Sequence, residues 1–148
     1  MTKEIKIVVG CIEADASLND TKTAHMVYDA LPITGKINLW ADEIYFYITL
    51  ETELEDGKET VTLGDIAYWP EGPALCIFLG KTPISRGNEI RPASAVNVIG
   101  EIKDINTLLK KAKDGEKITL RRWVWKYWKR SEPEDQSVIL SQNRCPRN

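Results

Sequence analysis

Apolar and polar residues alternate along several short stretches of this chain, which is the pattern of β-strands with one buried face. Alternation is clearest at 5–9 and at 44–50, where Ile44 and Phe46 fall on one face and tyrosines on the other. Gly10 interrupts the first stretch, so we expect a strand pair or one bent strand there. Further strand-like stretches lie at 37–40, 66–69, 74–79, 95–102 and 116–125. The pattern predicts about eight short strands in total.

Two other stretches place apolar residues at the i, i+3, i+4, i+7 spacing of an amphipathic helix. The first occupies 24–31, with capping residues before it and Pro32 after it. The second begins after Asp104 and ends at 114–115, an Asp-Gly pair. Strands and helices do not alternate as they do in a parallel α/β fold. A mostly antiparallel sheet or barrel with two helices packed on it is therefore predicted.

The stretch 64–80 departs from simple alternation, because apolar side chains occupy both faces of its two strands. A barrel buries one face of each strand, and a helix or loop outside can bury the other. We expect Leu75 and Ile77 to face the barrel interior, and Phe78 and Trp69 to lie under a helix or loop.

Length and charge restrict the classes of function. The chain has 148 residues, the size of one ordinary domain, and its 20 basic and 22 acidic residues give a net charge of -2. That balance predicts no chain-wide attraction to nucleic acid or anionic membrane. The apolar runs are shorter than the roughly 18 to 20 residues that a membrane-spanning helix needs. The N-terminal stretch has no signal-peptide cleavage pattern, and a cytoplasmic protein is predicted.

Histidine and cysteine, the common zinc ligands, are scarce in this chain. The three cysteines Cys11, Cys76 and Cys145 are widely spaced without a CxxC motif, which predicts neither a disulfide framework nor a zinc site. His25 is the only histidine and is expected to be exposed on the first helix. Glu43, in a turn-like acidic stretch, is expected to be solvated. No metal and no cofactor are predicted.

A polar connection at 80–94 contains two prolines, two arginines and two glycines. Long irregular loops in compact domains are often functional. Together with the aromatic residues before it, this loop offers apolar walls and a few polar contacts, the makeup of a small-molecule or peptide site. The candidate ligand-binding residues are Tyr68, Trp69, Phe78, Thr82, Ser85, Arg86 and Arg91. Alternatively, the aromatic residues are core, the arginines form surface ion pairs, and Arg91 ties down the loop by bonding backbone carbonyls.

Several blocks of the sequence resemble a known family. The string "VIGEI" followed by "DINTLLKKAKDGEKITL" resembles the end of the cyclophilin barrel, and "TKTAHMVYDAL" is similar to its first helix. The blocks "NLWADEIYF", "GDIAYWPEGPALCIFLGKTPIS" and "EIRPASAVNVIGEI" resemble a small prokaryotic cyclophilin-like family. The resemblance implies a mainly β fold, a closed or nearly closed eight-stranded antiparallel barrel with two capping helices. The barrel domain is expected at 3–123, and 124–148 is expected to be a mobile C-terminal extension.

The resemblance does not carry enzymatic activity with it. True cyclophilins use an arginine that hydrogen-bonds the prolyl amide as its conjugation is lost. The matching stretch 33–46 contains no arginine, and Lys36, its only cation, lacks the planar fork of a guanidinium. We therefore favour a non-catalytic module that binds a small molecule or peptide, with peptidyl-prolyl cis-trans isomerase as the alternative.

A third hypothesis concerns the stretch 121–130, which holds five basic and four aromatic residues. Phosphate-neutralising cations interleaved with stacking rings are typical of proteins that bind single-stranded nucleic acid. Membrane or partner docking, or a final strand followed by a solvated tail, are the other interpretations. A monomer and a homodimer both remain open. The residues that would contact nucleic acid are Arg121, Arg122, Trp125, Lys126 and Trp128.

Overall fold

A nine-stranded antiparallel sheet forms the body of the protein. The computed structural model describes residues 2–104 and 108–123. The strands follow one another in space in the order β3-β9-β1-β2-β8-β6-β7-β5-β4. Their bounds are β1 (Lys3–Val9), β2 (Ile12–Leu18), β3 (Ile33–Lys36), β4 (Asn38–Trp40), β5 (Glu43–Tyr47), β6 (Asp65–Trp69), β7 (Ala74–Phe78), β8 (Asn97–Ile102) and β9 (Lys117–Arg122).

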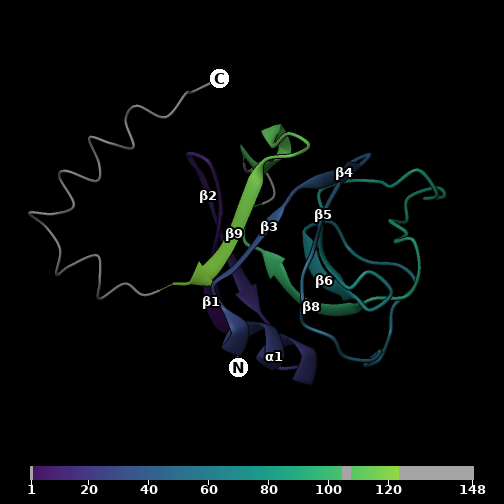
Figure 1. Ribbon diagram of the computed structural model, residues 1–148. Helices are drawn as coiled ribbons and strands as arrows, with labels where there is room; N and C mark the ends of the chain where they lie inside the picture. Colours follow the sequence, from purple (N-terminus) through teal and green to yellow (C-terminus); the bar gives the residue numbers. More distant parts are fainter. Residues whose placement is uncertain (1, 105–107, 124–148) are drawn as a thin grey trace, which may run out of the picture.

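The sheet curls into a nearly closed barrel because its two edge strands are consecutive in the chain. Only Ile37, which is buried, separates β3 from β4, so the chain passes there from one edge of the sheet to the other. Where the two edges of the sheet approach each other, Gly35 of β3 packs on Phe46 of β5. A Cβ at Gly35 would lie 2.7 Å from the Phe46 ring, so a glycine is needed for the close approach. The predicted barrel is confirmed, with nine strands rather than eight (Figure 1).

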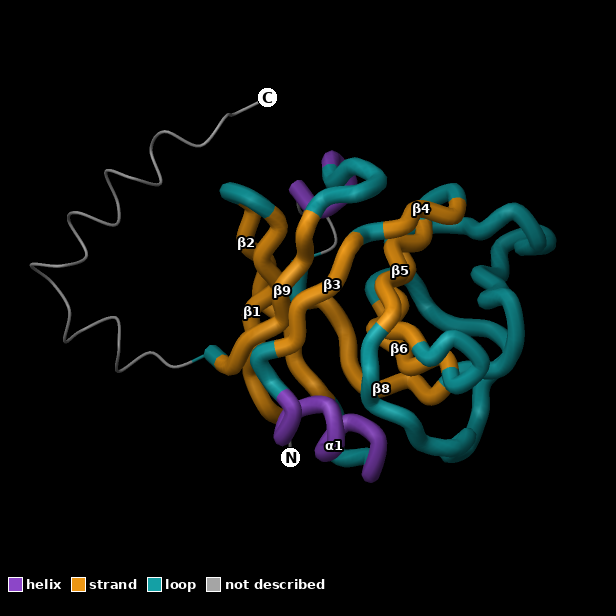
Figure 2. Tube along the Cα trace, viewed as in Figure 1, coloured by secondary structure: helices purple, strands orange, loops and turns teal. Residues whose placement is uncertain are grey.

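Helical segments lie at the two ends of the barrel (Figure 2). Helix α1 (Lys22–Ala30) starts at Thr21, whose hydroxyl accepts a hydrogen bond from the Ala24 backbone N–H. It ends before Pro32, as the sequence predicts. The second predicted helix is described only as the 3₁₀ helix η1 (Leu108–Lys111), and residues 105–107 lie outside the described residues. The Ala112 N–H bonds to the Leu109 carbonyl three residues back, which is the tighter 3₁₀ pattern.

Two separate apolar clusters hold the structure together. The interior cluster fills the barrel with aliphatic side chains from the strands, α1 and η1, together with Phe46 and Tyr68. The Tyr68 hydroxyl is satisfied by the Leu50 carbonyl and the Thr52 N–H. The outer-face cluster lies on the other side of β5, β6, β7 and β8. Its buried members are Ala67, Cys76, Phe78, Ile90 and Val96, and Tyr45, Val61, Trp69 and Val98 pack against them.

Two long loops cover this outer face and explain why every residue of β7 is buried. The loops run between β5 and β6 and between β7 and β8, and Figure 2 shows them gathered on one side of the barrel. They are joined to each other by bridges between Lys58 and Val96 and between Val61 and Ile90. The expectation that Phe78 and Trp69 lie under a loop, while β7 also faces the interior, is confirmed.

Three further predictions concern membrane-spanning helices, the C-terminal extension and the cysteines. Among the described residues no helix is of the length and apolarity that crossing a membrane demands. The predicted extension at 124–148 lies outside the described residues. Cys76 is free and buried, whereas Cys11 in the β1–β2 turn is disulfide-bonded, so the prediction from cysteine spacing is wrong at Cys11. Spacing failed there because a disulfide depends on proximity in space rather than in sequence.

Candidate functional site

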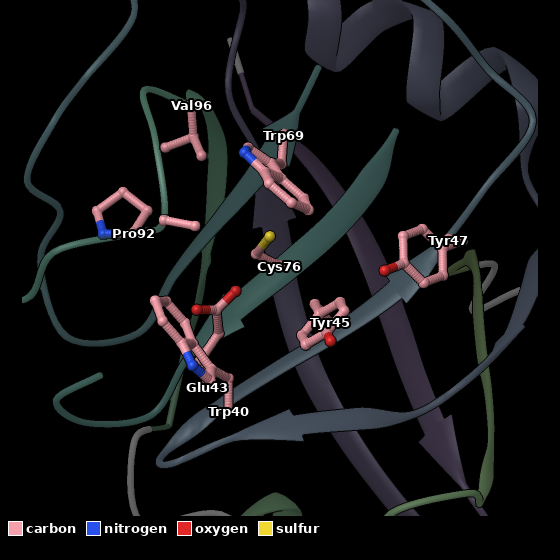
Figure 3. Close-up of a pocket in the computed structure, with 9 residues that line it drawn as sticks. Trp40, Glu43, Tyr45, Tyr47, Trp69, Cys76, Pro92 and Val96 are labelled. Carbon is pink, nitrogen blue, oxygen red and sulfur yellow. The ribbon is translucent and has the colours of Figure 1, made fainter. Parts of the chain in front are cut away.

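A cavity of about 210 Å³ opens on the outer face of the barrel. We call it the outer-face pocket. Its floor comes from β4, β5, β6 and β7, and its rim from the loop that precedes β8 (Figure 3). The lining residues are Trp40, Glu43, Tyr45, Tyr47, Trp69, Cys76, Pro92, Ala93 and Val96.

Strand register brings these side chains together. Trp40 pairs with Glu43 across β4 and β5, and Tyr45 pairs with Cys76 across β5 and β7. Ala74 of β7 lies between Tyr47 on one neighbouring strand and Trp69 on the other. Paired residues project from the same face of a sheet, so large rings flank the small side chains of β7. The hollow is a consequence of this alternation of large and small.

The aromatic walls are held by specific contacts. The rings of Tyr45 and Tyr47 meet edge to face, with centroids 5.8 Å apart and planes at 89°. The loop 79–96 between β7 and β8, which we call the covering loop, is tied to the Trp69 ring. The indole N–H of Trp69 donates to the Ser94 hydroxyl at 2.6 Å. Tyr47 is 55% exposed and stands at the mouth of the pocket. An aromatic ligand could therefore enter past Tyr47 and contact rings on several sides.

Glu43 is the acidic group of the pocket. Its side chain is only 4% exposed, and the carboxyl points between Trp40, Cys76 and Pro92 in Figure 3. Burial raises the pKa of Glu43 to about 7, and the neighbouring Cys76 thiol partly opposes this shift. Burial and the nearby Glu43 carboxylate raise the pKa of Cys76, which keeps the thiol neutral. At neutral pH the Glu43 carboxyl is thus present in both protonation states.

The covering loop is fastened by its own polar side chains. The Ser85 hydroxyl accepts hydrogen bonds from the backbone N–H groups of Thr82 and Arg91, each at 3.0 Å. The Thr82 hydroxyl donates to the Arg91 carbonyl, and the Arg91 guanidinium pairs with Glu89 at 2.8 Å. These bonds fix the backbone immediately before Pro92, so they place the rim of the pocket.

The family model for cyclophilin-like proteins matches residues 3–121. The chain belongs to the cyclophilin-like family. The suspected resemblance is thereby confirmed, and the match covers nearly all of the predicted barrel domain.

Two solved structures resemble this cyclophilin-like barrel. The first is the solution structure of a hypothetical protein from Archaeoglobus fulgidus, which is 44% identical in sequence and gives a TM-score of 0.67. The match covers 82% of this chain and 95% of that protein's chain. McbB in complex with tryptophan is 16% identical, with a TM-score of 0.60, and the match covers 82% of this chain but 44% of McbB. At that identity the likeness to McbB concerns the fold alone. No curated protein matches the sequence.

The structure separates the residues that the sequence suggested as a ligand site. Trp69 lines the outer-face pocket, whereas Tyr68 belongs to the interior cluster and Phe78 is fully buried in the outer-face cluster. The other four belong to the covering loop. Thr82, Ser85 and Arg91 fasten it, and Arg86 is exposed.

Of the nine residues that line the pocket, sequence reasoning identified only Trp69. The eight that it missed are Trp40, Glu43, Tyr45, Tyr47, Cys76, Pro92, Ala93 and Val96. The prediction that Glu43 is solvated is wrong, because its strand begins one residue earlier than the turn-like sequence indicates and the covering loop buries it. The available signal was the alternation at 43–47, which puts Glu43 on the same face as two tyrosines.

Other candidate groups lie away from the pocket. Lys36 is exposed on β3, and His25 is exposed on α1 with a hydrogen bond to Asp20. The Arg122 guanidinium stacks on the Tyr28 ring, 4.4 Å from its centroid, and donates to the Tyr28 carbonyl. Arg121 lies 3.8 Å from Glu13. The remaining residues suggested for nucleic acid, Trp125, Lys126 and Trp128, lie outside the described residues.

Proposed function

We propose that this cyclophilin-like barrel is a small-ligand-binding module and that the outer-face pocket is its site. The observation that carries the proposal is a cavity of about 210 Å³ whose walls include four aromatic side chains and one buried carboxyl. Apolar walls with a few placed polar groups are the usual composition of small-molecule sites. Binding without catalysis is favoured because the isomerase arginine has no counterpart in the sequence at 33–46.

The size of the cavity restricts the ligand. Pockets for drug-sized ligands usually measure about 300 to 1,000 Å³. The outer-face pocket is smaller, so a ligand with a single ring suits it, and an extended peptide could insert at most one side chain. We therefore favour a small molecule over a peptide within the class of ligands that the sequence suggested.

The proposal can be tested by nuclear magnetic resonance with benzyl alcohol, a neutral single-ring probe. We expect saturable shifts of the indole N–H signals of Trp40 and Trp69. Ala93 is exposed on the pocket rim, so Ala93→Trp should obstruct the cavity without disturbing the core. Ala30→Trp, at an exposed position on α1, is the matched control and should bind normally.

The proposal is overturned if benzyl alcohol shifts neither indole signal in the wild-type protein. It is also overturned if the shifts persist unchanged in Ala93→Trp. Loss of the shifts in that variant alone, with the spectrum of the barrel core unaltered, supports the outer-face pocket as the site.

A further inference from the structure

Glu43 differs from the other buried polar side chains of the described residues. Those three, Thr23, Thr82 and Asn97, each make hydrogen bonds with protein partners. Glu43 has one carboxylate oxygen, Oε1, that is buried without a hydrogen-bond partner among the described residues. A buried polar atom without a hydrogen-bond partner is destabilising and calls for an explanation. The oxygen belongs to a pocket-lining side chain, so a ligand can supply the missing donor.

The charges around the carboxyl indicate which donor suits it. None of the lining residues that the structure describes is basic, so no protein cation neutralises Glu43 there. The titratable groups that face it are Cys76 on β7 and Tyr45 on its own strand, and burial is the main cause that raises both of their pKa values. Both groups therefore stay neutral between pH 5 and pH 8. The covering loop contributes only Pro92, Ala93 and Val96 to the lining, which carry no charge.

Aromatic rings favour the same class of ligand. The face of an indole or phenol ring is electron-rich and attracts cations, most strongly where water is excluded. Trp40, Tyr45, Tyr47 and Trp69 place four such rings around the pocket that contains the carboxyl. An ammonium group can donate hydrogen bonds to a carboxylate while its apolar body contacts rings.

We propose that the outer-face pocket selects small ligands that carry a protonated amine on an apolar, ring-sized body, with the ammonium paired to Glu43. This inference rests on the proposed function, because it assumes that the pocket is the binding site. It adds to that function the chemical class of the ligand and the residue that determines it.

Proton linkage makes the inference quantitative. The ammonium pairs with the ionised carboxyl, and the pKa of Glu43 in the free protein is about 7. The ammonium group of an alkylamine is chemically similar to the lysine ammonium group, whose pKa is about 10.4. The ligand therefore stays charged between pH 5 and pH 8. The fraction of protein that is competent to bind then rises with pH. Affinity for the amine should increase roughly 100-fold from pH 5 to pH 8.

The experiment compares three probes of similar shape: benzylamine, benzyl alcohol and benzoate. Affinities are measured by nuclear magnetic resonance at pH 5, 6, 7 and 8 for the wild-type protein and for Glu43→Gln. We expect benzylamine to bind at least tenfold tighter than benzyl alcohol at pH 8, and benzoate to bind weakest. Glu43→Gln should remove this preference and the pH dependence of benzylamine affinity.

The outcomes separate the inference from the proposed function. If benzyl alcohol binds in the pocket but benzylamine is no tighter, or its affinity does not change with pH, the amine inference is overturned and the binding module stands. Failure of benzyl alcohol to bind in the pocket at every pH overturns both, because the amine inference rests on the binding module. The pH series on the wild-type protein decides the question even if Glu43→Gln does not fold.

Discussion

The two faces of β5 offer the sharpest comparison in this molecule. Ile44 and Phe46 point into the barrel and are buried among aliphatic side chains. Glu43, Tyr45 and Tyr47 alternate with them along the same five residues and line the outer-face pocket. Side chains of a strand point to opposite faces at every step, so one short segment serves two purposes. The inner face contributes to the core, and the outer face lines the pocket that we propose as a binding site.

The faces differ because they are covered in different ways. The nearly closed sheet and the helical segments at its ends cover the interior, where Phe46 and Tyr68 are fully buried. The outer face is covered by loops that are held by a few bridges and side-chain hydrogen bonds, such as that between Trp69 and Ser94. Loops cover a sheet less completely than a second layer of strands would, and a pocket remains. A strand that is buried on both faces, as β7 is, can therefore lie between a core and a pocket.

The largest expected loss of stability comes from a substitution on the inner face of β5. Phe46 is fully buried and packs against Gly35, so Phe46→Ala should lower the free energy of unfolding by about 3 to 5 kcal/mol. Tyr47 is its neighbour on the opposite face and is 55% exposed, so Tyr47→Ala should cost less than about 1 kcal/mol while weakening benzyl alcohol binding. Denaturant unfolding of both variants measures the difference. Equal losses of unfolding free energy in the two variants would contradict the conclusion that the inner face contributes more to stability than the outer face.

The next effect is a pH dependence that comes from the outer face. The pKa of Glu43 is raised by burial from 4.5 to about 7, so its proton stabilises the folded state. That stabilisation is fully present below about pH 4.5 and is lost as pH rises through 7. Between pH 5 and pH 9 the wild-type protein should lose about 2 to 3 kcal/mol relative to Glu43→Gln. Unfolding by urea at the two pH values measures this, and a constant difference between the two proteins would refute it.

The smallest effects sharpen the role of the covering loop. Thr82→Val removes a buried hydroxyl that bonds the Arg91 carbonyl, and should cost about 1 to 2 kcal/mol and weaken probe binding by moving the rim. Arg91→Ala removes only a partly exposed ion pair with Glu89, so it should change stability less than Thr82→Val does. Arg86→Ala, at an exposed position, should change stability by less than about 0.5 kcal/mol and leave binding intact. Urea unfolding and benzyl alcohol titration measure all three. A large loss of probe affinity in Arg86→Ala would place the site on the loop instead.

Much of the fold could be predicted from local patterns. Period-two alternation identified the strand around Phe46, and the cap before α1 together with Pro32 identified the helix. The double burial of β7 was also predicted, including Phe78 on the outer face. These predictions succeeded because each depends on side-chain spacing within one element.

The candidate site was harder to predict, since its residues come from four strands and a loop. Trp69 was identified because it borders an unusual segment, whereas Glu43 was assigned to solvent because acidic residues in turn-like sequence usually are exposed. The loop residues Pro92 and Val96 change that environment, although they lie about fifty positions away. Nothing local to Glu43 indicates which loop will lie over it.

The sequence by itself determined most of the strands, the first helix, the burial of both faces of β7, and the family. Only the tertiary structure decided the strand order, the consecutive edge strands that nearly close the barrel, and the placement of a buried carboxyl among four rings. The physical reason is that side-chain direction repeats within a few residues of one strand. Burial, and with it the pKa of Glu43, depends on every segment that packs against the site.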